Sequence, residues 1–91
     1  MHVTLNVAKN YLRVDSSDDD ALIEQLITTA TGMVNDISRM SDEELAPYKD
    51  IVATAELYII AYLYEHREEA DHRKLTETVK YLLFSVRKEA F

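Results

Sequence analysis

The chain contains a single glycine, Gly32, and a single proline, Pro47. Glycine and proline form most of the tight turns in a β-rich fold, so their scarcity argues against strands joined by many short hairpins. It also leaves no glycine-rich loop that could hold a phosphate group. We therefore expect an all-α fold, a small bundle of about four helices with a long central helix.

The first two helices are marked by caps and by apolar residues at helical spacing. Thr4 can cap a short helix over residues 5–12, whose apolar residues share one face. The acidic segment 15–20 follows. We expect Asp18 and Asp19 to cap the next helix, because carboxylates satisfy the free N–H groups at a helix start. That helix covers about residues 19–38 and has one apolar face, formed by Leu22, Ile23, Leu26, Ile27, Ala30, Met33, Val34 and Ile37.

The middle of the sequence predicts the long central helix. Ser41 and Glu44 match a capping box, and the helix follows from about Pro47 to Arg67. It carries two apolar stripes on nearly opposite sides, with Glu56 on one flank between them, so it must pack between layers or between subunits. The broad stripe contains Tyr48, Ile51, Val52, Ala55, Tyr58, Ile59, Tyr62 and Leu63, and the second contains Ala53, Leu57, Ile60, Ala61 and Tyr64.

A charged link over residues 65–74 leads to a last helix with apolar side chains on one face. These side chains are Leu75, Val79, Leu82, Leu83 and Val86. Tyr81, Phe84 and Phe91 lie off that stripe and are expected to be exposed. The second apolar stripe of the central helix also needs a cover, which the last helix, a neighbouring subunit or both must provide. The candidate interface is therefore Leu57, Ile60, Tyr64, Tyr81, Phe84 and Phe91.

The charge balance limits the partners. Ten Lys and Arg residues against 17 Asp and Glu residues give a net charge of −7 and a pI near 4.8. Such a surface repels phosphate backbones, so a grip on nucleic acid through a basic face is not expected. Hydrophobic residues make up 47% of the chain, which suffices for one small domain over residues 1–91 and leaves some for a partner. The apolar tract 57–64 is far shorter than the roughly 18 residues of a membrane span, so we expect a soluble protein made in the cytoplasm.

No motif predicts catalysis, a metal or a cofactor. The absence of cysteine excludes disulfides and a thiolate nucleophile. Counted from Asp15, a calcium-binding EF-hand loop would need a glycine and a bidentate carboxylate where Asp20 and Leu26 stand. The Glu-x-x-His motif of Glu69 and His72 occurs once, whereas a di-metal bundle needs it on two helices. The serines and histidines show no arrangement typical of nucleophilic catalysis.

Four segments, in the same order, resemble the phage head-tail connector family. Residues 3–15 read VTLNVAKNYLRVD, a threonine-capped short helix followed by an L-R-V-D elbow. Residues 18–23 read DDDALI, an acidic spacer that leads into a long helix. Residues 59–68 read IIAYLYEHRE, an apolar helix that ends in Y-E-x-R-E, and residues 75–88 resemble the family's C-terminal helix.

The resemblance implies a structural virion protein without enzymatic activity, metal or cofactor. Members of the family assemble as rings beneath the portal, extend the DNA channel and carry neck or tail components. For this chain the resemblance implies a homo-oligomeric ring matched to the twelve-fold portal, with double-stranded DNA only as cargo. The protein would be made in the host bacterial cytoplasm and sit at the head-tail junction of the virion, away from any membrane. The six candidate interface residues would then face a second subunit or the portal.

Two other classes stay open from the residues alone. An acidic helical protein-interaction module, such as a DNA-mimic inhibitor or a small regulator, would carry ordered carboxylates across a continuous face. In this chain the acids cluster at the ends of the expected helices instead. A metal-dependent helical enzyme would need a ligand set, and the calcium and di-metal templates above do not supply one.

Overall fold

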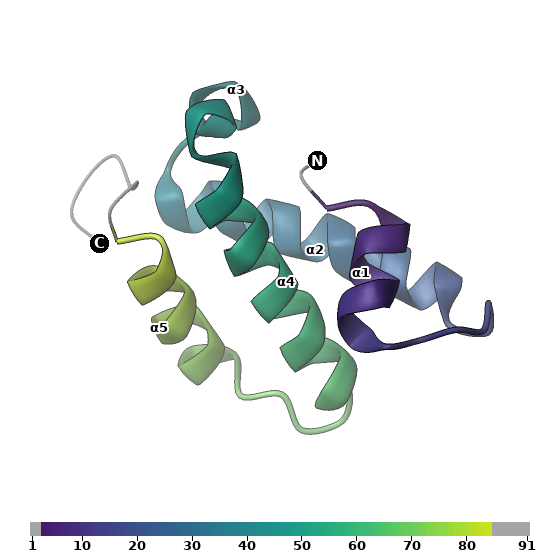
Figure 1. Ribbon diagram of the computed structural model, residues 1–91. Coiled ribbons are helices and arrows are strands. Elements are labelled where there is room, and N and C mark those ends of the chain that lie inside the picture. Colours follow the sequence, from purple (N-terminus) through teal and green to yellow (C-terminus); the bar gives the residue numbers. More distant parts are fainter. Residues whose placement is uncertain (1–2, 85–91) are drawn as a thin grey trace.

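The computed structural model describes residues 3–84, and all regular structure in that range is helical (Figure 1). The elements are α1 (Leu5–Leu12), α2 (Asp20–Ser38), α3 (Asp42–Leu45), a short 3₁₀ helix η1 (Ala46–Tyr48), α4 (Lys49–Glu65) and α5 (His72–Leu82). The expected all-α bundle with a long central helix is therefore confirmed.

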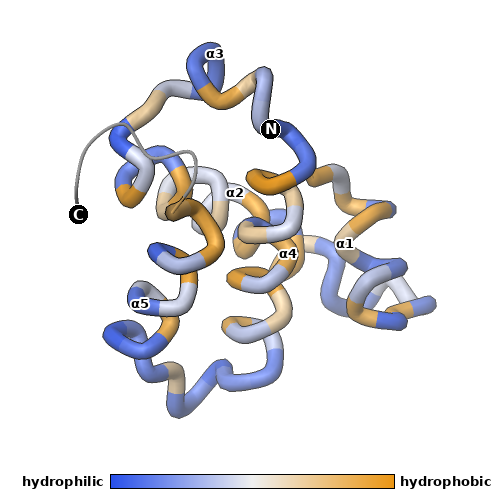
Figure 2. The backbone as a smooth tube through the Cα atoms, turned by 60° about the vertical axis from the view of Figure 1, so that its left-hand side comes forward, coloured by the Kyte–Doolittle hydropathy of each residue, from blue (hydrophilic) through white to orange (hydrophobic). Residues whose placement is uncertain are grey.

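Helix α4 lies at the centre of the bundle. It packs along α2, and α1 and α5 lie on either side of it in both Figure 1 and Figure 2. This arrangement explains why the helix is apolar around most of its circumference, since three other helices cover it. In Figure 2 the link between α4 and α5 is almost entirely hydrophilic, as expected for an exposed connection.

Helix α1 begins and ends as the sequence predicts. The Thr4 hydroxyl accepts a hydrogen bond from the Val7 N–H group at 3.2 Å, which satisfies one free donor of the first turn. The helix stops at Arg13, whose φ of 60° is left-handed, and α2 stops in the same way at Arg39, with φ of 61°. Glycine is the usual residue at such positions, because a Cβ atom raises the energy of this conformation.

The long helix expected from about residue 47 begins two residues later, at Lys49, and a separate short helix precedes it. The capping box exists, since Ser41 accepts from the Glu44 N–H group at 3.2 Å and Glu44 accepts from the Ser41 N–H group at 3.0 Å. It opens only the four-residue α3, however, and Pro47 lies in η1 before α4 begins at Lys49. Proline has no N–H group to continue an α-helical ladder, which favours a break at this point.

The last helix begins three residues earlier than its apolar stripe suggests. The Asp71 side chain accepts a hydrogen bond from the Lys74 N–H group at 3.0 Å and so caps α5 from His72 onward. The expected buried stripe is confirmed at Leu75, Val79 and Leu83, each 0% exposed. Val86 lies outside the described residues.

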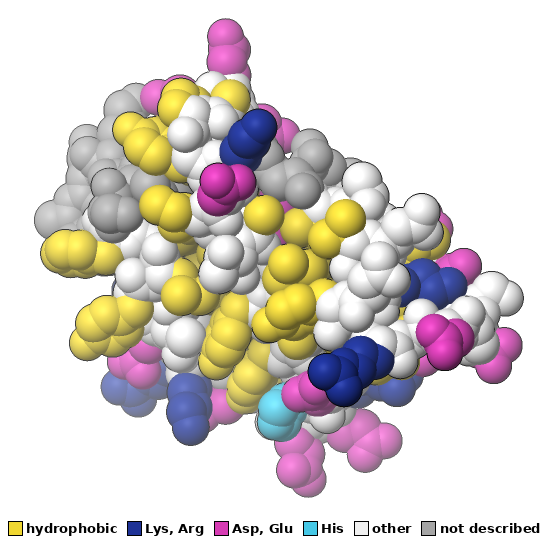
Figure 3. All heavy atoms as spheres, viewed as in Figure 1, with side chains coloured by type: hydrophobic (Ala, Val, Ile, Leu, Met, Phe, Trp, Pro, Cys, Tyr) yellow, Lys and Arg dark blue, Asp and Glu magenta, His cyan; other side chains and the backbone are white. Residues whose placement is uncertain are grey.

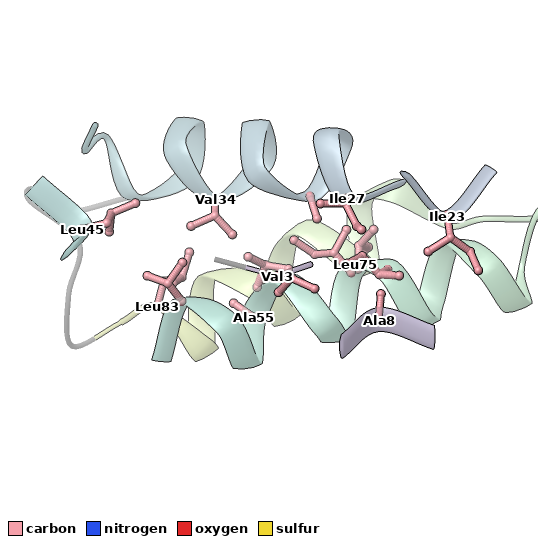
Figure 4. Close-up of a cluster of buried hydrophobic side chains, with 14 residues drawn as sticks. Val3, Ala8, Ile23, Ile27, Val34, Leu45, Ala55, Leu75 and Leu83 are labelled. Carbon is pink, nitrogen blue, oxygen red and sulfur yellow. The ribbon is translucent and has the colours of Figure 1, made fainter. Parts of the chain in front are cut away.

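The core is a continuous apolar cluster to which all five α-helices and Val3 contribute. In Figure 4 the α2 side chains of Ile23, Ile27 and Val34 point toward Ala8 of α1, Ala55 of α4 and Leu75 of α5. The buried members are Val3, Ala8, Ile23, Ile27, Ala30, Val34, Leu45, Val52, Ala55, Ile59, Ile60, Leu75, Val79 and Leu83. Both apolar stripes of α4 thus contribute to one core, the second through Ile60.

Candidate interaction surfaces

The acidic segment 15–20 is held by two contacts to other helices. Asp19 occupies the N-cap position of α2, but its side chain makes no capping hydrogen bond. The Tyr64 hydroxyl at the end of α4 donates to Asp19 Oδ2 at 2.6 Å instead. The expectation that Asp19 caps the helix is therefore wrong, because its carboxylate accepts a hydrogen bond from the neutral Tyr64 hydroxyl of α4 instead of from the first turn of α2.

The second contact joins the segment to α1. The Lys9 ammonium lies 2.7 Å from Asp20 Oδ1, and both side chains are largely covered. Tyr64 is further enclosed by the Arg67 guanidinium, 4.8 Å from its ring centroid, in a cation–π contact. The hydrogen bond to Asp19 raises the pKa of Tyr64, since loss of the phenolic proton would place two anions together. The start of α2 is thus tied to both α1 and α4.

Three rings stack in a row, from two half-buried tyrosines of α4 to the histidine directly after it. Tyr58 and Tyr62 have ring centroids 6.4 Å apart, and Tyr62 and His66 have centroids 4.3 Å apart. The Tyr62 hydroxyl accepts a hydrogen bond from the Asp71 N–H group at 3.0 Å, which fixes the link to α5. This arrangement holds the rings in place at the surface.

A groove of about 540 Å³ runs between the end of α1 and this stack. We call it the α1–α4 groove, and it is lined by Tyr11, Leu12, Arg13, Tyr58, Ala61, Tyr62 and Glu65. Tyr11 is 54% exposed, and the left-handed backbone of Arg13 closes one end of α1 beside it. Three of its seven lining residues are therefore aromatic and two are aliphatic, and one basic and one acidic side chain complete the lining.

Among the aromatic residues that the structure describes, the most exposed lie on α5 and directly after it. Tyr81 is 83% exposed and Phe84 is 64% exposed, and we call this pair the α5 ridge. A surface hollow of about 480 Å³ beside them is also lined by Glu77 and Lys80. In Figure 3 apolar side chains project from the α5 edge of the molecule. Exposed rings of this size are typical of a contact surface.

The other candidate interface residues have different positions. Ile60 is 0% exposed and lies in the core, while Leu57 and Tyr64 are half-buried against it. The structure places none of these three beside the α5 ridge on an exposed surface. Phe91 lies outside the described residues. Of the five candidates within residues 3–84, Tyr81 and Phe84 are the two that are broadly exposed.

Glu56 is a buried acid that the sequence pattern did not reveal. The pattern places it on a flank of the central helix, but it lies in the core with 1% exposure. Neither carboxyl oxygen has a hydrogen-bond partner among the described residues. The nearby Thr31 hydroxyl of α2 lowers the pKa of Glu56. This effect is the smaller one, because the hydroxyl proton of Thr31 is donated to the Ile27 carbonyl at 3.0 Å. Burial is the larger effect and raises the pKa of Glu56 from 4.5 to about 7.

Between residues 3 and 84, no three His, Asp or Glu side chains are grouped so that they could hold a metal ion. In the same range, no helix is both long and apolar enough to cross a bilayer.

The chain is similar in sequence to one protein family. The model of the family described as phage gp6-like head-tail connector protein matches residues 2–90. No curated protein and no solved structure matches the chain. The family match covers all five α-helices and both surfaces described above.

Proposed function

Because the chain belongs to the phage gp6-like head-tail connector family, we propose that it forms a homo-oligomeric ring beneath the portal of a phage head. The ring extends the channel through which DNA passes and carries the neck or tail components. Its role is structural and non-catalytic, and its place is the head-tail junction of the virion.

Apart from the family match, the main support for this proposal is the exposure of the two aromatic rings of the α5 ridge. Single apolar residues are common on protein surfaces, but two large rings with 83% and 64% exposure on one helix edge are a costly arrangement in an isolated chain. Aromatic residues are enriched at protein interfaces, where they bury a large area for little loss of side-chain freedom. A subunit that functions in an assembly has a use for such a ridge.

The charge of the chain also supports a conduit. With a net charge of −7, the surface repels the DNA phosphates instead of holding them. DNA moves through a channel more easily when the channel wall does not bind its phosphates. On the face shown in Figure 3, acidic side chains gather at the rim, and the centre of that face is apolar or neutral. Basic side chains lie beside them at that rim, so the face in Figure 3 is not the continuous acidic face that a DNA mimic would present.

The proposal is tested by measuring assembly. Light scattering of the purified protein at several concentrations, with and without purified portal, should show a rise in mass toward a closed ring or a portal complex. A chain that stays monomeric at all concentrations and does not bind the portal would contradict the connector function. A chain that binds a basic DNA-binding protein, but neither itself nor the portal, would support the DNA-mimic alternative.

A further inference from the structure

We propose that neighbouring copies of the chain join head to tail, with the α5 ridge of one copy seated in the α1–α4 groove of the next. This inference rests on the proposed ring and names the two faces that form it. It commits to a second copy as the occupant of the groove, on the basis of size, aromatic lining and charge.

The groove has the size and lining for the ridge. Its volume of about 540 Å³ lies within the roughly 300–1,000 Å³ of pockets that enclose a compact organic group. Tyr11, Tyr58 and Tyr62 supply ring faces and edges, and the ridge supplies the rings of Tyr81 and Phe84. Aromatic pairs in offset or edge-to-face contact are more favourable than their buried area alone implies.

The charges around the two surfaces are complementary. The ridge is flanked by Glu77 and Lys80, and the groove is flanked by Arg13 and Glu65. Each surface therefore carries one acidic and one basic side chain, so its local charge is balanced although the chain as a whole carries −7. Two copies of an acidic chain repel each other across most of their surfaces, and balanced patches are where they can approach. The pairs we expect are Lys80 with Glu65, and Glu77 with Arg13.

The positions of the two surfaces suit a ring. The ridge lies on α5 and the groove borders α1, and these helices lie on either side of α4 (Figures 1 and 2). One copy can therefore use both surfaces at once, with a different neighbour at each. A contact between two unlike surfaces is heterologous and repeats around a ring when the rotation closes, whereas a contact of one surface with itself stops at a dimer.

A charge exchange tests the pairing directly. The variants Lys80→Glu and Glu65→Lys each place like charges opposite each other, so each should raise the concentration needed for half-assembly by roughly tenfold. The double variant restores opposite charges with the order reversed, and it should assemble nearly as well as the original chain. Glu68→Lys is the matched control, since it makes the same change at an exposed residue outside the groove and should leave assembly close to normal.

A second arm tests the rings. Tyr81→Ser changes a side chain that is 83% exposed, so helicity measured by circular dichroism should be unchanged while self-assembly is lost. Portal binding is measured for every variant alongside self-assembly. Single charge variants that assemble normally would overturn the pairing, and so would a double variant that is not restored. Loss of portal binding with normal self-assembly would assign the ridge to the portal and also overturn it.

The failure of this inference is distinguishable from the failure of the proposed function. If the original chain forms a ring but the charge variants do not follow the expected order, the ring stands and the pair of faces is wrong. If the original chain forms no ring and does not bind the portal, both are wrong.

Discussion

At the scale of single residues, the buried carboxyl of Glu56 makes the stability of the fold depend on pH. An ionised carboxylate in an apolar core without a hydrogen-bond partner is unfavourable, so the proton is held more tightly in the folded chain than in the unfolded one. Asp42, at the start of α3, adds to the effect, because its negative charge also raises the pKa of Glu56. The pKa of this carboxyl is therefore 4.5 in the unfolded chain and about 7 in the folded chain.

The sign of the pH dependence follows from this difference. Below pH 4.5 both states carry the proton, and the carboxyl does not oppose folding through its charge. As the pH rises from 4.5 to about 7, the unfolded chain releases the proton first, so the free energy of unfolding falls. The total loss from this one group is about 3 kcal/mol, and it is complete above pH 7.

We predict that Glu56→Gln removes this part of the pH dependence. Urea unfolding of the variant and the original chain is compared at intervals from pH 4 to pH 8. As the pH rises across that range, the free energy of unfolding of the original chain should fall by about 3 kcal/mol relative to that of the variant. The constant effect of burying an amide cancels in this comparison. Asp50→Asn, at an exposed acid on the same helix, should show no such shift, and parallel curves for Glu56→Gln would contradict the assignment.

Tyr64 carries the second residue-scale prediction. Tyr64→Phe removes the 2.6 Å hydrogen bond to Asp19 and keeps the ring, so it should lower the free energy of unfolding by more than the control substitution does. Thermal or urea unfolding near neutral pH measures the change. Tyr11→Phe is the control, because that side chain is 54% exposed in the groove and should change stability by less than about 0.5 kcal/mol. Equal effects of the two substitutions would show that the hydrogen bond to Asp19 is not what stabilises the start of α2.

Neither feature could be read from the sequence, for physical reasons. The Tyr64–Asp19 bond joins residues 45 positions apart, and no local pattern indicates which hydroxyl a carboxylate at a helix start will meet. Glu56 was assigned to a flank because an acid on an amphipathic helix usually marks the wet side. That rule fails on α4 because other helices lie behind it and on both sides, which leaves little wet side.

At the scale of elements, periodicity predicted most of the structure. Apolar spacing located α1, α2 and the buried face of α5, and Thr4 and the Ser41–Glu44 capping box were confirmed as caps. The short helix α3 was not predicted as a separate element, because the capping box was expected to lead into the helix that starts at Pro47, whereas the backbone tightens there into η1. The Asp71 cap was missed because it lies in a run of charged residues where any of several could serve.

The middle of α2 offers a prediction about stability. Gly32 is exposed, and a Cβ atom built on it would have no heavy atom within 4 Å. Gly32→Ala should therefore raise the free energy of unfolding by about 0.5–1 kcal/mol, because alanine loses less backbone entropy in a helix. Urea unfolding measures it. Thr29→Ala, one turn earlier on the exposed side, is the control and should have a smaller effect, and a destabilised Gly32→Ala would indicate a contact at this position in an assembly or in the fold.

At the scale of the whole molecule, the net charge of −7 sets the conditions for assembly. Acidic copies repel each other over distances that salt shortens to about 10 Å at 0.1 M. We predict that self-assembly strengthens as sodium chloride rises from about 20 mM to about 200 mM, because long-range repulsion is screened before the close pairs at the contact are. Sedimentation velocity at fixed protein concentration checks this, and assembly that weakens steadily with salt would contradict it.

The placement of the tyrosines has an optical consequence. The chain has six tyrosines and no tryptophan, so its ultraviolet emission comes from tyrosine alone. Tyr11, Tyr58 and Tyr62 line the α1–α4 groove, and Tyr81 lies on the α5 ridge. If a ridge enters a groove, excitation energy can pass between rings of different copies, and the emitted light loses polarisation. Assembly can therefore be followed in unlabelled protein by the fluorescence anisotropy of its own side chains, without a dye that would disturb the contact.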